Sequence, residues 1–372
     1  RLMCPGYPVE DQVKPDLKLV RKGVARLKGV VHHLGEVRVF VGGEVLQDRL
    51  RHVDELVRGF EGKDDDGDNS PGGHNASHGP EHIRLDGCAR AHIDKPVVGD
   101  DQVLVRVRAA GVDPGVWHLM TGMPYLVRLM GYGLRTPKHR VRGTDFAGRV
   151  EAVGKNVTRF TAGDEVFGTC DGSFAEYACA DETKVAPKPV NLTFEQAAAV
   201  PVSALTALQG LRDKGQVQAW HKVLIIGAAG GVGTFAVQIA KAFGAHVTGV
   251  CSTTKVNLVR SIGADEVIDY TRDDFAGGGR RYDVILDTAG NRSLSQLRRA
   301  LAKRGTLVIV GGEGGGKWTG GFERALWALM LSPFVGQKLS ALVSGENAED
   351  LLVLKELIEA GDLTPVTDRT YS

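Results

Sequence analysis

The sequence predicts an α/β protein in which a parallel sheet, covered by helices on both faces, accompanies a second, smaller β-rich unit. From Lys222 onward strand-like and helix-like segments alternate, and strands such as KVLII and TLVIVGG are apolar throughout, which is typical of a sheet buried on both faces. Before them, from about residue 95, short strands with alternating apolar and polar residues are separated by glycine turns.

Composition favours small molecules as partners. The chain has 372 residues, 42% hydrophobic and 24% charged, with a formal net charge of +1, which argues against nucleic acid or an anionic membrane. No run of about 18 apolar residues predicts a membrane span, and residues 1 to 13 lack the apolar core of a signal peptide, so we expect a cytoplasmic protein. The odd number of cysteines and the absence of a CxxC pair argue against a disulfide framework and a thiolate zinc cluster.

Residues 1 to 92 form an N-terminal extension to which we assign no domain. Residues 14 to 34 and the segment LQDRLRHVDELVRGF have helical spacing, and EVRVFVGGEVL is typical of a hairpin that turns at Gly42-Gly43. Residues 61 to 82 are acidic and rich in glycine and histidine, which predicts a flexible linker. The spacing of His74, His78 and His82 would also suit a metal on a helix, but the surrounding glycine and proline favour a linker.

The segment IGAAGGVGTFAVQ lies between the first apolar strand and the first helix of the parallel unit. Gly227, Gly230 and Gly233 form a GxxGxxG variant of the dinucleotide fingerprint, with Gly231 and Val232 between them. The helix N-terminus offers unpaired N–H groups and a partial positive charge, which a diphosphate approaches closely only where no Cβ intervenes. Glycines that merely close a tight turn are the alternative, but the strand, the helix and the βαβ repeats favour nucleotide binding.

A second diagnostic position lies about 20 residues on, where an Asp or Glu would hold the ribose 2′-hydroxyl of NAD. Here the chain has Cys251, Ser252, Thr253 and Lys255, without a carboxylate. Hydroxyl and ammonium groups suit a 2′-phosphate, so the pattern favours NADP(H). The alternative is that Lys255 is only an exposed residue of the next helix.

These residues, together with GTDFAGRVEAVGKNVTRFTAGDEVFG and AAAVPVSALTAL, resemble the medium-chain dehydrogenase/reductase superfamily, in its branch of zinc-independent quinone oxidoreductases and related NADP-dependent reductases. The resemblance covers about residues 93 to 371. It implies a GroES-like substrate domain over 93–198, a Rossmann NADP-binding domain over 199–340, a return segment over 341–372, and a homodimer. We expect the first strands of the substrate domain to be missing and the return segment to be truncated.

The resemblance also implies further contacts with the cofactor. Thr206 is expected near the cofactor helix and Tyr270 beside the adenosine ribose. Gly290, Val310 and Gly311 are expected at the ends of later strands. Turn and core roles are the alternative for these residues, and for Gly290 and Gly311 both roles are compatible.

Zinc-dependent relatives carry a Cys ligand after the first long strand and a GHE motif farther along. The corresponding residues here are Gly111-Val112-Asp113 and Gly143-Thr144-Asp145, so we expect no catalytic metal. Reduced nicotinamide would then pass hydride to a polarised enone or quinone while a hydrogen-bond donor stabilises the developing anion.

The identity of that donor stays open. The loop GVDPGVWHLMTG has Asp113 and His118 where the family has an Asn and often a Tyr. His118 suits proton donation near neutral pH, or packs beside Trp117. Asp113 orients cofactor or substrate, or caps the turn at Pro114. Tyr125 is a further catalytic candidate, and Thr144 and Asp145 are pocket candidates.

The predicted function is a zinc-independent, NADPH-dependent oxidoreductase acting on a quinone, an enone or a similar conjugated carbonyl compound. A non-enzymatic NADP-binding protein is the alternative from another class. Within the enzyme class, enoyl-thioester reduction and alcohol oxidation stay open. The sequence does not identify the substrate.

Overall fold

The computed structural model describes the backbone of residues 38–41 and residues 93–122, 124–125, 128, 141–277, 279–311 and 318–371. The helices expected in the first 60 residues, the linker at 61–82 and its three histidines lie outside the described residues. Of the segment expected to form a hairpin, only the strand β1 (Arg38–Val41) is described. The expected hairpin is wrong, because β1 pairs with β13 (Arg369–Tyr371) on one edge and with β2 (Gln102–Val112) on the other and leaves no edge for a hairpin partner.

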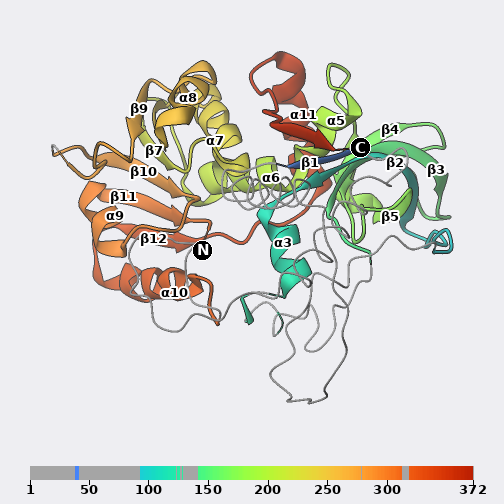
Figure 1. The fold of residues 1–372 in the computed structure, drawn as a ribbon, viewed down its shortest axis with the longest axis horizontal. Helices are drawn as coiled ribbons and strands as arrows, with labels where there is room; N and C mark the ends of the chain where they lie inside the picture. The colour runs from blue at the N-terminus through green and yellow to red at the C-terminus, as the bar shows by residue number, and fades with distance from the viewer. Residues whose placement is uncertain are drawn as a thin grey trace, which may run out of the picture.

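The first sheet has the strand order β13-β1-β2-β3-β4-β6, with β5 also paired to β2 (Figure 1). Its strands are β1, β2 (Gln102–Val112), β3 (Asp145–Val153), β4 (Glu165–Thr169), β5 (Tyr177–Asp181), β6 (Val185–Pro187) and β13 (Arg369–Tyr371). Val103, Val105 and Val107 of β2 are buried in one core while Arg106 is exposed. The predicted alternation holds only in the middle of the strand, because Leu104, Ala109 and Ala110 are buried as well.

The second sheet is parallel, with the order β12-β11-β10-β7-β8-β9. Its strands are β7 (Lys222–Ile226), β8 (His246–Cys251), β9 (Glu266–Asp269), β10 (Tyr282–Asp287), β11 (Leu301–Ile309) and β12 (Lys338–Ala341). This is the order of a Rossmann sheet, in which the connection reverses direction between β7 and β10. A ligand site is expected beyond the carboxyl ends of the strands at that point.

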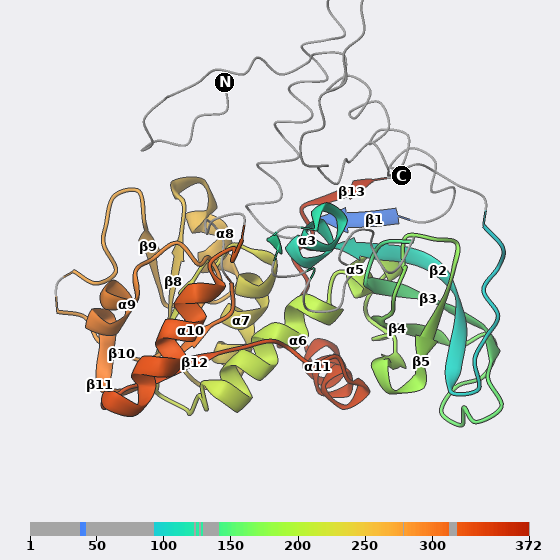
Figure 2. The same ribbon diagram turned by 90° about the horizontal axis from the view of Figure 1, so that it is seen from below.

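Helices cover both faces of the parallel sheet, as Figures 1 and 2 show. Val223 and Ile225 of β7 belong to the core shared with α6 and α7, whereas Leu224 and Ile226 belong to the core shared with α9 and α10. Because side chains alternate along a strand, the fully apolar strands follow from burial on two faces, which confirms the prediction. The helices around the two sheets are α3 (Pro114–Thr121), α5 (Phe194–Ala198), α6 (Pro201–Gln209), α7 (Gly231–Ala242), α8 (Val256–Ser261), α9 (Leu294–Ala300), α10 (Phe322–Leu331) and α11 (Ala348–Ala360).

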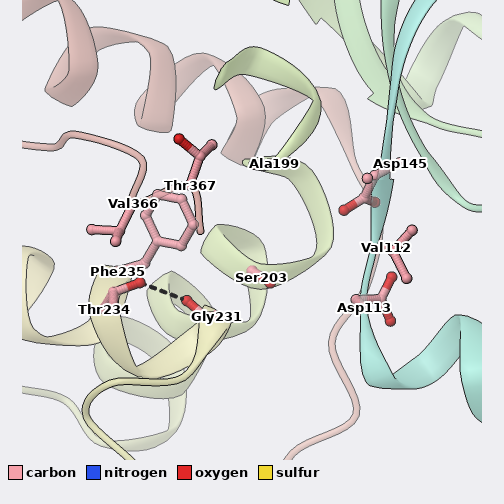
Figure 3. Close-up of a pocket in the computed structure, with 11 residues that line it drawn as sticks. Val112, Asp113, Asp145, Ala199, Ser203, Gly231, Thr234, Phe235, Val366 and Thr367 are labelled. Atoms are coloured by element: carbon pink, nitrogen blue, oxygen red, sulfur yellow. Dashed lines mark hydrogen bonds between the residues drawn. The ribbon is translucent and has the colours of Figure 1, made fainter. Parts of the chain in front are cut away.

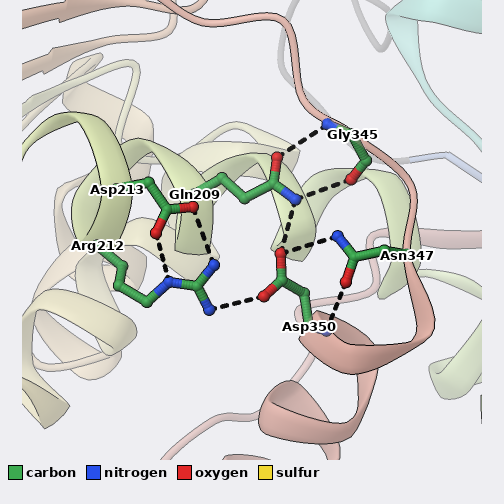
Figure 4. Close-up of polar contacts among 6 residues, drawn as sticks. All are labelled: Gln209, Arg212, Asp213, Gly345, Asn347 and Asp350. Atoms are coloured by element: carbon green, nitrogen blue, oxygen red, sulfur yellow. Dashed lines mark hydrogen bonds and ion pairs between the residues drawn. The ribbon is translucent and has the colours of Figure 1, made fainter.

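A polar network joins α6 to α11 (Figure 4). Asp350 accepts hydrogen bonds from Gln209 at 2.8 Å, from Asn347 at 3.0 Å and from Arg212 at 2.6 Å. Arg212, in the π-helical turn Gly210–Lys214, also binds both carboxylate oxygens of Asp213. The network fixes the start of α11.

From α11 the chain crosses α7 and returns to the first sheet. Gln238 of α7 and Thr364 exchange hydrogen bonds of 3.0 and 2.8 Å. The chain then enters β13, which pairs antiparallel with β1, while β1 runs parallel to β2. Part of the unassigned N-terminal extension therefore contributes a strand to the first sheet. No helix in the described ranges is long and apolar enough to cross a membrane.

Candidate active site

A pocket lies where the two sheets meet, at the carboxyl end of β7 (Figure 3). One wall comes from the end of β2 and the start of β3, and the opposite wall comes from the first turns of α7. The start of α6 and the return segment complete it. The lining residues are Gly111, Val112, Asp113, Asp145, Ala199, Ser203, Gly231, Thr234, Phe235, Val366 and Thr367.

The glycines of the fingerprint bring α7 close to the end of β7. Gly227 has a φ of +82°, a conformation that other residues rarely adopt. A Cβ on Gly233 would lie 2.0 Å from the carbonyl oxygen of Gly227, so no larger residue fits there. Gly230 is the N-cap of α7 and offers no side chain to bind the first N–H groups of the helix. Those groups have no intrahelical acceptor, so the backbone of Gly231 and its neighbours fits a diphosphate.

Ser252, Thr253 and Lys255 follow the end of β8, and the fold adds a carboxylate beside them. Thr253 Oγ1 donates to Asp269 Oδ2 at 2.6 Å, and this hydrogen bond is the main reason that the pKa of Asp269 lies below its usual value. Lys255 Nζ lies 3.8 Å from Asp368 Oδ1, so this side chain is not simply an exposed helix residue.

Sequence reasoning missed Asp269 because the search for a carboxylate considered only the end of β8. Asp269 closes the neighbouring parallel strand β9, and parallel strands end on the same edge of a sheet. The βαβ repeat was therefore the available signal.

Of the predicted contacts at later strand ends, two glycines also have structural reasons for their identity. Gly290 has a φ of +73°, and its N–H donates to Asp287 Oδ1 at 3.2 Å. A Cβ on Gly311 would lie 2.4 Å from the carbonyl oxygen of Thr288. Val310, just before it, is half-buried and donates its N–H to the carbonyl of Asp287.

Thr206 and Tyr270 lie outside the pocket lining. Thr206 is buried on α6, where Oγ1 donates to the carbonyl of Val202 at 2.7 Å and lies 2.9 Å from Ser344 Oγ. Tyr270 is 44% exposed, and the guanidinium of Arg292 lies 5.9 Å from its ring centroid. Tyr270 directly follows Asp269, so it lies at the same strand edge as Thr253.

Two buried carboxyl groups line the pocket. Asp113 is the N-cap of α3, and its Oδ1 accepts N–H groups from Gly115 at 2.6 Å and Val116 at 3.2 Å. This is the capping role that the sequence offered as an alternative, and the side chain also faces the pocket lining. Both oxygens of Asp145 lie 3.3 Å from the N–H of Val202, near the start of α6.

Burial is the main cause of the raised pKa of both carboxyl groups. It raises the pKa of Asp113, although the N–H groups of Val116 and Gly115 and the charge of His118 partly oppose the shift. It also raises the pKa of Asp145 well above its usual value, and the neighbouring Asp113 adds to the effect. Ionisation of Asp113 therefore makes ionisation of Asp145 in the same pocket less favourable.

The three predicted catalytic residues are not gathered in this pocket. Asp113 lines it, but His118 lies half-buried farther along α3 and is absent from the lining. Tyr125 packs edge-on against Trp318 at 5.2 Å between ring centroids, and Thr144 is also absent from the lining. Sequence reasoning missed Ser203 and Thr234, although Ser203 lies in the quoted segment AAAVPVSALTAL.

Among the described residues, no group of three or more His, Cys, Asp and Glu side chains is arranged to hold a metal ion. Asp113 and Asp145 are the acidic residues of the pocket lining, and neither thiolate nor imidazole lines it. This donor set does not fit the three-ligand sites typical of catalytic zinc.

Two families match the chain. The alcohol dehydrogenase GroES-like domain matches residues 99–190, and the family described as zinc-binding dehydrogenase matches residues 231–328. A quinone oxidoreductase of Sus scrofa is 37% identical over 245 residues, which is 63% of this chain and 71% of the relative. A 2-methylene-furan-3-one reductase of Solanum lycopersicum is 32% identical over 291 residues, covering 75% and 67% respectively.

Two solved structures that resemble this chain are also quinone oxidoreductases. The quinone oxidoreductase from Coxiella burnetii has a TM-score of 0.63 with 27% identity, covering 73% of this chain and 83% of that one. The quinone oxidoreductase of Escherichia coli complexed with NADPH has a TM-score of 0.61 with 26% identity, covering 74% and 84%. The chain belongs to the medium-chain dehydrogenase/reductase superfamily, in its quinone oxidoreductase-like branch. This confirms the predicted family and the predicted pairing of a GroES-like domain with a Rossmann sheet.

Proposed function

We propose that this chain is an NADPH-dependent oxidoreductase that reduces a quinone, an enone or a similar conjugated carbonyl compound. One observation carries the proposal: the N-terminus of α7 and two buried carboxyl groups line the same pocket between the sheets. The relatives support the substrate class, because they include quinone oxidoreductases and a furanone reductase.

The chain's own residues have distinct tasks in this proposal. The N–H groups at the start of α7 bind the diphosphate, and Ser252, Thr253 and Lys255 bind the 2′-phosphate. The bound nicotinamide supplies the hydride. The walls from β2, β3 and α6 exclude water from the reacting carbonyl, which strengthens every electrostatic contact inside the pocket.

We also propose that the reaction proceeds without zinc. The support is the donor set of the pocket, in which Asp113, Asp145, Ser203 and Thr234 supply only oxygen atoms. Negative charge that develops on a substrate carbonyl then requires a hydrogen-bond or proton donor from the chain.

An acceptor panel tests this function. Purified protein is mixed with NADPH and quinones, enones, enoyl thioesters or, in the reverse direction, alcohols with NADP⁺, and absorbance of the reduced nicotinamide is followed. We expect turnover with quinones or enones, unaffected by a strong zinc chelator. Tight NADPH binding without turnover on any acceptor would instead support the non-enzymatic binding protein.

We propose a homodimer whose interface includes α10. A cytoplasmic location stays a prediction. Several large apolar side chains on and around this helix are exposed: Trp318 75%, Leu326 59%, Trp327 62%, Met330 55% and Phe334 86%. Such a cluster is typical of an interface. The adjacent strand β12 is an edge of the parallel sheet.

A further inference from the structure

One carboxyl oxygen in the pocket has no hydrogen-bond partner among the described residues. Asp113 Oδ1 binds two N–H groups, and both oxygens of Asp145 face the N–H of Val202. Asp113 Oδ2 is buried without a partner. A buried oxygen without a hydrogen-bond partner is destabilising, so a ligand atom or a proton at this position stabilises the site.

The surroundings favour a proton at this site over a metal cation. The carboxyl groups have few oxygens left for coordination, because three of the four already face N–H groups.

The charged groups around Asp113 and Asp145 do little to stabilise negative charge on these two carboxyl groups. His118 favours ionisation of Asp113, whereas Glu346 disfavours ionisation of both groups. Glu346 is itself paired with Lys184 at 2.7 Å, so this ammonium is engaged elsewhere. Two buried carboxylates that repel each other hold their protons more tightly, and they titrate as a pair.

We propose that Asp113 and Asp145 hold one proton between them at neutral pH and that Asp113 Oδ2 delivers it to the substrate oxygen. This inference rests on the proposed function. With NADPH bound, its hydride would form a new C–H bond at the β-carbon of an enone or at a quinone carbon, and the displaced π electrons of the conjugated system would place negative charge on the carbonyl oxygen. The Oδ2–H bond breaks as the new O–H bond forms, and the pair regains a proton from water after product release.

Asp145 acts as the positioning residue that keeps the proton on the pair. A developing oxyanion beside Oδ2 draws the proton to that atom, because the other carboxyl oxygens are already engaged. Asp113 replaces an Asn of the resembling family, and an Asn in this position carries no ionisable proton. The departure from the family pattern thus accounts for a proton donor in a loop that lacks the family's Tyr.

Four variants test the proposal: Asp113→Asn, Asp145→Asn, the double variant, and Asp181→Asn as the control. Asp181 also caps a helix, through the N–H of Thr183, but it lies outside the pocket lining. Asn is as good an N-cap as Asp, so α3 keeps its start in the first variant.

The first readout needs no turnover. The infrared difference spectrum of wild type minus the double variant at pH 7 should show the carbonyl band of a protonated carboxylic acid, and wild type minus Asp181→Asn should not. Absence of that band from the first difference overturns the shared proton.

The second readout uses an acceptor that the wild type reduces. We expect kcat of Asp113→Asn to fall about 100-fold or more, with NADPH affinity unchanged and the alkaline decline of kcat lost. For Asp145→Asn we expect that decline to move to lower pH. If the wild type turns over and Asp113→Asn has the same kcat and the same pH profile, the proposed proton delivery is wrong. A wild type without turnover on any acceptor contradicts the proposed function, and the infrared result then still decides the protonation of the pair.

Discussion

Thr253 Oγ1 donates a 2.6 Å hydrogen bond to Asp269 Oδ2, which brings a carboxylate from β9 to the hydroxyl cluster that follows β8. An acidic group at this edge is what a Rossmann fold uses to hold a ribose 2′-hydroxyl. The same edge carries Lys255, an ammonium suited to a 2′-phosphate. In the proposed function, the preference between NADPH and NADH is therefore expected to depend on the balance between Lys255 and Asp269.

Opposite changes at these two positions should move the preference in opposite directions. In Lys255→Ala, loss of a charge-assisted contact is expected to weaken NADPH binding about tenfold or more while NADH binding changes little. In Asp269→Asn, loss of a negative charge should strengthen NADPH binding by a few-fold. Calorimetric titration of each variant with both nucleotides measures this. Equal weakening of NADPH and NADH in Lys255→Ala would show that Lys255 does not contact the 2′-phosphate.

Gly233→Ala tests the close approach of α7 to β7. Its Cβ would lie 2.0 Å from the Gly227 carbonyl, so the helix must shift. We expect a loss of about 1–3 kcal/mol in the free energy of unfolding and a large loss of nucleotide affinity. Gly345→Ala is the matched control, because no atom lies within 4 Å of a Cβ there. Equal stability and equal affinity in the two variants would refute a packing role for Gly233.

Because of the network around Asp350, the free energy of unfolding should depend on pH in the acidic range. Burial alone would raise the pKa of Asp350, but hydrogen bonds from Arg212, Asn347 and Gln209 outweigh it and lower the pKa. A depressed folded-state pKa contributes stability that is present above the unfolded value of about 3.9 and is lost as pH falls through the folded value.

We therefore expect Asp350→Asn to be less stable than wild type at pH 7, by about 1–3 kcal/mol, and the difference to shrink below about pH 4. Denaturant unfolding followed by circular dichroism at both pH values measures it. A stability difference that does not change with pH would contradict the assignment.

The exposed side chains of α10 should control assembly. Trp327→Glu places a charge in the proposed interface, so we expect it to shift the protein from dimer to monomer in light scattering. Leu352→Glu on α11, where the native side chain is 37% exposed, is the control and should stay dimeric. A dimeric Trp327→Glu protein would exclude this surface as the interface.

Local sequence patterns were sufficient for most of the fold. Apolar strands alternating with helices predicted the parallel sheet, because burial on both faces leaves no polar side to a strand such as KVLII. For the glycines from Gly227 to Gly233 the sequence favoured nucleotide binding, with a tight strand-to-helix turn as the alternative. The structure shows the tight turn, because the packing excludes a Cβ at Gly233, and nucleotide binding stays a prediction. Each of these patterns lies within one βαβ unit, in which segments that follow one another in the sequence also contact one another.

The pocket was predicted less completely because its walls are far apart in the sequence. Asp113 was considered as a catalytic candidate and Asp145 separately as a pocket candidate. Only the pairing of β2 with β3 and the packing of α6 bring them to one pocket with Gly231. Thr367 reaches the pocket through the return segment, whereas Asp269 lies beside Thr253 at the end of β9, and no local motif marks either residue. His118 was chosen for its chemistry, but its position along α3 takes it away from the pocket lining.

Calorimetric titration of the folded protein with NADPH and NADH tests the central claim most directly. We expect NADPH to bind at one site per chain, more tightly than NADH, and Gly233→Ala to abolish the heat of binding. Folded protein that binds neither nucleotide would contradict both the diphosphate site at α7 and the redox function built on it.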